Sequence, residues 1–142
     1  MTNHTGGCYC GNITIRFESG KTADALTPRA CDCDFCTLHG AEWLSDPEGA
    51  LTIEVQNEAA LSLFKQGSES AHFWICQNCG GVSAVTSEIG GKPKGAVNAR
   101  ALDDHATLPA SVPASPKVLS KDEKLSRWDT VWTPVAAIRN EW

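Results

Sequence analysis

The sequence predicts a mainly β protein with short strands, little helix and metal ions that crosslink the chain. Short segments that alternate apolar and polar residues recur along the chain, which is typical of half-buried strands. All seven cysteines lie in three tight clusters, as expected for a small, loop-rich fold that binds zinc. The 142 residues, 42% of them hydrophobic, suit one domain with a modest core. We therefore expect residues 1–142 to form a single domain.

The first alternating segment covers residues 12–18, where Ile13, Ile15 and Phe17 share one face of a predicted strand. Further strands are predicted at residues 41–44, 51–56, 61–65, 71–76, 82–86 and 95–99. The segments 61–65 and 71–76 should form a hairpin around residues 66–68, and the Asp-Pro-Glu-Gly turn at residues 46–49 should separate two other strands.

Helix is predicted at two places. Residues 34–38 form a short helical turn that Gly40 should end, and residues 122–128 form the second segment. Residues 108–116 are rich in Pro, Ala and Ser, and we expect an ordered crossing loop there rather than a linker between domains.

Charge and composition exclude several classes of partner. The formal net charge is -5 and no block of Lys or Arg occurs, which argues against nucleic acid. The polar N-terminus lacks an apolar signal core, and no segment is long enough to span a bilayer. We therefore expect a cytoplasmic protein with no membrane partner. The odd number of cysteines and the reducing compartment both disfavour a disulfide framework.

The first and third cysteine clusters predict a closed zinc site. Cys8-x-Cys10 and Cys76-x-x-Cys79 each precede a glycine, a pattern typical of metal knuckles and more typical of zinc than of iron–sulfur clusters. Two such pairs supply four thiolates, which complete a tetrahedron. We predict a structural zinc that ties the first strand to the middle hairpin.

The second cluster offers three thiolates, those of Cys31, Cys33 and Cys36. Three protein ligands leave one position of a tetrahedral zinc open, where an incoming thiol would be stabilised as the nucleophilic thiolate or a carbonyl oxygen would be polarised. The alternative is that His39, three residues after Cys36, closes the site and makes the second zinc structural. The sequence therefore predicts two zinc ions per chain, the second of them catalytic if its site stays open.

The other histidines are weaker candidates. His4 and His105 lie in polar surroundings and are predicted to be surface groups, whereas His72 should be packed or half-exposed in a strand. The tryptophans are expected mainly in the core, although one of them lining a ligand pocket is an open possibility.

The three motifs resemble the glutathione-dependent formaldehyde-activating enzyme family, which also includes centromere protein V. The residues concerned are Gly7-Cys-Tyr-Cys-Gly11, Cys31-Asp-Cys-Asp-Phe-Cys36 and Cys76-Gln-Asn-Cys-Gly80. The resemblance continues through Val97–Asp103 and more weakly to Trp128. The resemblance implies stacked β-sheets similar to the Mss4-like fold, with a structural and a catalytic zinc on the cysteines named above. It implies a carbon–sulfur lyase that condenses glutathione with formaldehyde to S-(hydroxymethyl)glutathione, a step in formaldehyde detoxification.

One departure from the family pattern keeps the substrate open. Family members often carry basic residues directly after the third cysteine of the middle cluster, where this chain has Thr37 and Leu38. Arg29, Lys65 and Arg100 are candidates to replace them. Two alternatives follow: an enzyme of the same fold that acts on another thiol conjugate or aldehyde, and a non-catalytic binding module with two zinc ions. The sequence does not specify the oligomeric state.

Overall fold

The computed structural model describes residues 1–66 and 69–140, with only the backbone described for residues 137–140. The strands are β1 (Thr2–Gly7), β2 (Ile13–Ser19), β3 (Arg29–Cys31), β4 (Trp43–Leu44), β5 (Ala50–Val55), β6 (Leu61–Phe64), β7 (His72–Cys76), β8 (Val82–Ile89), β9 (Lys92–Asn98), β10 (Val112–Ala114) and β11 (Thr133–Asn140). Two α-helices, α1 (Asp34–His39) and α2 (Lys121–Val131), accompany short 3₁₀ turns. The predicted mainly β fold with little helix is confirmed. Neither α-helix is long and apolar enough to cross a membrane, nor is any other helix in the described ranges.

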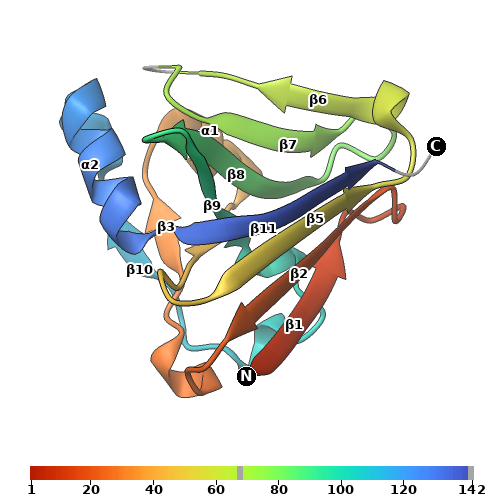
Figure 1. Ribbon diagram of the computed structural model, residues 1–142, viewed down its shortest axis with the longest axis horizontal. Coiled ribbons are helices and arrows are strands. Elements are labelled where there is room, and N and C mark those ends of the chain that lie inside the picture. The colour runs from red at the N-terminus through yellow and green to blue at the C-terminus, as the bar shows by residue number, and fades with distance from the viewer. Residues whose placement is uncertain (67–68, 141–142) are drawn as a thin grey trace.

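The strands form two layers that share β11 (Figure 1). One layer has the order β1-β2-β5-β11, and the other runs from β10 through β3, β4, β9, β8 and β7 to β6. The beginning of β11, Thr133 and Pro134, pairs antiparallel with β9, whereas its remainder pairs in parallel with β5. A single strand therefore joins the two layers.

Alternation along the second layer buries both of its faces. Trp74, Ala84 and Val97 form a cross-strand row on one face and pack against the apolar residues of β2 and β5 in the core between the layers. Their neighbours on the opposite face are Phe73, Val85 and Ala96, which pack in a second cluster with Cys36, Trp43 and Trp132. The middle cysteine cluster thus belongs to the outer face of this sheet.

The two helices cover that outer face. The Sγ of Cys33 caps α1 by accepting the Cys36 amide, and Gly40 ends the helix at a φ of 62°, a left-handed conformation that glycine adopts at low cost. Ser120 and Glu123 form a capping box that starts α2. The stacked rings of Trp128 and Trp132 at the end of α2, with centroids 4.3 Å apart, join the helix to the second cluster.

A buried carboxylate fastens the turn between β4 and β5. Asp46 is only 2% exposed; it accepts the Ser19 hydroxyl at 2.6 Å and the Glu48 amide at 3.0 Å, with Lys21 Nζ 3.8 Å away. Burial alone would raise the pKa of Asp46, but the two hydrogen bonds and the lysine charge together hold it below its ordinary value.

Most predicted elements are confirmed, including the hairpin of β6 and β7 and the helical turn α1. The turn predicted around residues 66–68 lies partly outside the described residues. Four strands were not predicted: β1, β3, β10 and β11. The expected loop at 108–116 contains β10, which pairs in parallel with β3. The prediction of a surface His4 is wrong, because its ring is buried and hydrogen-bonds Asp104 at 2.7 Å.

Candidate metal centres and the adjoining cavity

The first and third cysteine clusters come together although 66 residues separate Cys10 from Cys76. Cys8 and Cys10 lie in the turn between β1 and β2, whereas Cys76 ends β7 and Cys79 lies in the turn between β7 and β8. The Cys8–Cys10 and Cys10–Cys76 sulfur distances are 3.8 and 3.6 Å. Sulfurs bound to one tetrahedral zinc lie about 3.8 Å apart, given Zn–S bonds of about 2.3 Å. These two distances match a tetrahedral zinc, and all four sulfurs lie within 4.8 Å of one another.

The surroundings of these thiols shift the pKa values of Cys8 and Cys10 in opposite directions. The Ile13 amide donates to Cys8 Sγ at 3.2 Å. Hydrogen bonds from the Asn78 side chain and the Asn12 amide lower the pKa of Cys10 to about 6, whereas burial raises the pKa of Cys8 to about 11. Gly81 is required beside the site, since a Cβ there would lie 2.9 Å from the Cys8 Cβ.

The middle cluster forms a second group whose sulfurs lie within 4.8 Å of one another. We call Cys31, Cys33 and Cys36 the thiol triad. Cys31 ends β3 and the other two lie at the start of α1, so a three-residue strand and one helical turn set the spacing. Cys33 Sγ accepts the Cys36 amide at 3.4 Å and Gln66 Nε2 at 3.8 Å, and Cys36 Sγ accepts Trp43 Nε1 at 3.4 Å. These N–H donors hold the Cys33 and Cys36 sulfurs in position beside Cys31.

The pKa values of Cys31 and Cys36 are shifted in opposite directions. The hydrogen bond from Cys36 is the main cause that lowers the pKa of Cys31 to about 6, and burial opposes it. The same hydrogen bond, together with burial, raises the pKa of Cys36 far above its ordinary value. The two shifts have the opposite directions expected when Cys36 donates to Cys31.

His39 lies outside the thiol triad. Its Nδ1 hydrogen-bonds the Phe35 carbonyl at 2.8 Å, its ring packs on the Phe35 ring at 4.3 Å, and the side chain is exposed. Among the described residues, no His, Asp, Glu or further Cys joins the triad as a fourth ligand. The structure therefore does not support the alternative in which His39 joins the three cysteines and closes the second zinc site.

A cavity of about 500 Å³ opens beside the triad, and all three thiols line it. Trp43, Phe73, Trp128 and Trp132 form an aromatic wall, so the possibility that a tryptophan lines a pocket is realised three times. The volume lies in the range of small-molecule sites. None of the other four cysteines lines this cavity.

Four cations also line the cavity, namely Arg29, Lys117, Lys124 and Arg127, and no Asp or Glu of the described chain does. Burial lowers the pKa of Arg29, and the nearby Arg127 charge adds to the effect, yet an arginine remains protonated at neutral pH. Of the three sequence candidates only Arg29 lies here. Lys65 does not line the cavity, and Arg100 instead pairs with Glu42 at 2.9 Å.

The sequence reasoning did not identify the cations of α2. Lys124, Arg127, Trp128 and Val131 all line the cavity, and their spacing of three, four and seven residues is that of one helical face. That spacing was a usable signal. It did not, however, reveal that this face lies against the thiol triad.

Comparisons with known proteins agree with this geometry. The model of the family described as "Glutathione-dependent formaldehyde-activating enzyme" matches residues 3–115. The crystal structure of a Rhodobacter sphaeroides protein is similar to this chain, with a TM-score of 0.54 and 26% sequence identity over 75% of this chain and 99% of that one. No curated protein is similar enough to this chain to be matched.

Proposed function

Because this chain belongs to the glutathione-dependent formaldehyde-activating enzyme family, we propose that it is a zinc-dependent carbon–sulfur lyase. The proposed reaction condenses glutathione, or another thiol, with formaldehyde or a related small electrophile. In that reaction the thiol sulfur forms a bond to the carbonyl carbon, the carbonyl π bond breaks, and the proton lost by the thiol ends on the new hydroxyl oxygen. The reverse reaction is carbon–sulfur cleavage.

The observation that carries this proposal is a thiol triad at the edge of a cavity, to which no described residue adds a fourth side-chain ligand. A zinc ion held by Cys31, Cys33 and Cys36 would supply an open position where a substrate thiol is stabilised as the thiolate. The chain's own groups support this: Trp43 donates to Cys36 Sγ, and four aromatic rings line the cavity beside the triad. A cavity of about 500 Å³ is far larger than formaldehyde needs, so its size supports a bulkier thiol partner.

We assign a structural role to the other four thiols. Cys8, Cys10, Cys76 and Cys79 lie away from the cavity and join the β1–β2 turn to the β7–β8 turn. Four thiolates complete a tetrahedron and leave no position for substrate. Zinc at both sites needs reduced thiols, which supports a cytoplasmic location. The strand β11, shared by both layers, supports a single domain.

The test is a metal count combined with the rate of adduct formation. Zinc-loaded protein should contain two zinc ions per chain and accelerate the exchange between formaldehyde and its glutathione adduct, followed by exchange NMR at equilibrium. The C33S variant should lose one zinc and the acceleration. The C79S variant is the matched control. It should lose the zinc of the four-thiol site, whereas the fraction of the protein that stays folded should still accelerate the exchange.

Two results separate the alternatives. Two bound zinc ions with no acceleration for glutathione, but with acceleration for another thiol or a larger aldehyde, would point to the same chemistry on a different substrate. Two zinc ions with no response to any thiol would identify a non-catalytic binding module.

A further inference from the structure

We propose that Arg29 and Arg127 form a carboxylate-binding pair, and that Arg127 makes the cavity select thiols that carry a carboxylate. This inference rests on the proposed function, since the thiol must reach the triad. It goes further by naming the group that the cavity recognises and the residue that recognises it.

The first support is that the charge of this pair is not compensated within the described chain. Arg29 donates from Nη2 to the Ser45 hydroxyl at 2.7 Å, and Ser45 in turn donates to the Val131 carbonyl at 2.7 Å. This neutral chain of hydrogen bonds fixes the guanidinium without neutralising it. Among the described residues, no carboxylate lies within 4.0 Å of Arg29 or Arg127. Arg29 is partly buried, and a partly buried charge without a partner is costly unless an anion binds it. Arg127 is exposed and lines the same cavity, where it adds a second positive charge.

The second support is that the acidic side chains of the neighbouring segments do not line the cavity. Asp129 of α2 pairs with Lys94 at 2.8 Å, outside the cavity. Glu123 accepts the Ser120 amide at 2.9 Å in the capping box, and Asp32 accepts the Ser115 hydroxyl.

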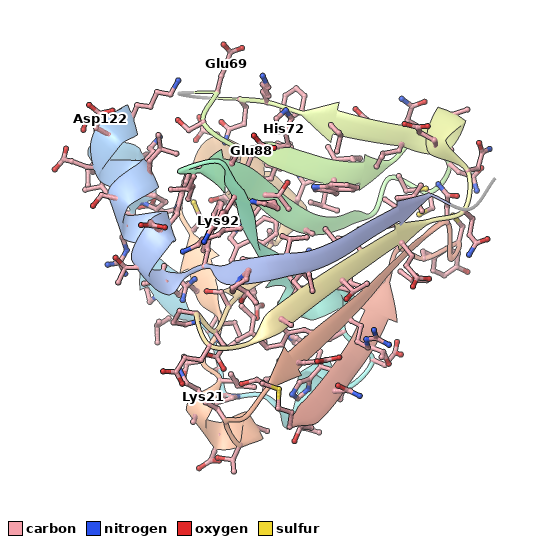
Figure 2. The ribbon with its side chains drawn as sticks, viewed as in Figure 1. Lys21, Glu69, His72, Glu88, Lys92 and Asp122 are labelled. Carbon is pink, nitrogen blue, oxygen red and sulfur yellow. The ribbon has the colours of Figure 1, made fainter. Side chains whose placement is uncertain are left out.

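Two further carboxylates near this end of the molecule lie at its periphery. Figure 2 shows Glu69 at the outer tip of the segment between β6 and β7, and Asp122 at the outer end of α2. Both are exposed and neither lines the cavity. Among the described residues, the cavity lining therefore carries four cationic and no acidic side chains, while the charge of Asp32 acts on Cys31 at its edge.

The third support is the chemistry of the two side chains. A guanidinium presents parallel N–H groups that match both oxygens of a carboxylate. Arg29 lies two residues before Cys31 in β3, so an anion held there is close to the triad. Thr37 and Leu38, where family members often carry basic residues, are exposed and do not line the cavity. Arg127 lies in α2, beyond residues 3–115 that match the family, so this recognition belongs to the chain's C-terminal segment.

The test compares two ligands with the same thiol, glutathione and its dimethyl ester, whose carboxylates are blocked. Binding to zinc-loaded protein is measured by calorimetry and, with cobalt in place of zinc, by the visible spectrum of the metal. The variant is R127E, with R127K as the conservative change. The matched control is K121E, because Lys121 lies on the same helix, is exposed, and does not line the cavity.

We expect R127E to weaken glutathione binding by about 10- to 100-fold, the range of a lost charge-assisted hydrogen bond. Binding of the dimethyl ester should change by less than about twofold, R127K should retain part of the affinity for glutathione, and K121E should match the wild type. An equal loss of affinity for both ligands in R127E, or none for either, overturns the carboxylate pair and leaves the lyase proposal standing. If the wild-type protein binds neither thiol at the triad metal, both proposals fail.

Discussion

The two proposed metal sites should stabilise the folded protein by different amounts, and this difference can be measured. Replacing Cys10 and Cys79 together by serine removes one ligand from each half of the four-thiol site. Both side chains are at least partly exposed, so little core packing is lost, in contrast to Cys8 and Cys76, which are part of the core. The matched variant is C31S/C33S, which removes two half-buried thiols of the triad.

The expected magnitudes follow from the loops that the metals close. The four-thiol site joins residues separated by 66 positions, and a crosslink over that distance stabilises a chain by about 4 kcal/mol in the chain-entropy treatment. The triad closes a loop of only about five residues, for which the same treatment yields about 2 kcal/mol. At about 3 °C per kcal/mol for a chain of this size, C10S/C79S should lower Tm by about 12 °C and C31S/C33S by about 6 °C.

The assay is thermal unfolding of the zinc-loaded proteins followed by circular dichroism, with a metal count that confirms one zinc lost per variant. In excess chelator the difference between the two variants should largely disappear, because neither crosslink then exists. If C10S/C79S is no less stable than C31S/C33S when each retains one zinc, the structural role assigned to the four-thiol site is refuted.

Two further predictions concern single side chains. W43F removes the indole N–H that donates to Cys36 Sγ, so the zinc affinity of the triad should fall by about 10-fold. The affinity is measured by competition with a chromophoric chelator, and the affinity of the four-thiol site should stay unchanged. If W43F and the wild type bind zinc at the triad equally tightly, this hydrogen bond has no role in metal binding. D46N should destabilise the protein by about 1–3 kcal/mol at pH 7. Because the folded pKa of Asp46 lies below its ordinary value, its stabilisation is complete above about pH 4–5 and is lost as the pH falls through the folded pKa. Urea unfolding at pH 7, 5 and 3.5 should therefore show a constant gap between wild type and D46N at the upper two values and a smaller gap at the lowest; a gap that persists undiminished at pH 3.5 contradicts the assignment.

Local patterns were sufficient where one residue type decides the structure. Alternation in β2 placed Ile13, Ile15 and Phe17 on a buried face, since a strand turns successive side chains to opposite sides. The position of Gly40 marked the end of α1. The cysteine spacings sorted seven thiols into four and three, because the geometry of a metal site restricts which residues can share it.

Local patterns failed where the partner of a residue is distant in sequence. The strand β1 carries little apolar alternation because it is an edge strand, and His4 seemed exposed because its partner, Asp104, lies a hundred residues away. The short strands β3 and β10 contain three residues each, too few for a pattern to emerge, and they exist because they pair with each other.

The sequence by itself determined the mainly β character, the two sets of thiols and the family. Each depends on the spacing of residues along the chain, because covalent geometry fixes the relative positions of side chains that are close in sequence. Only the tertiary structure decided that His39 turns away from the triad and that Arg127 faces the same cavity as Arg29. These relations depend on how β3, α1 and α2 pack on one face of a sheet. The local sequence of one segment does not indicate which distant segment it will contact.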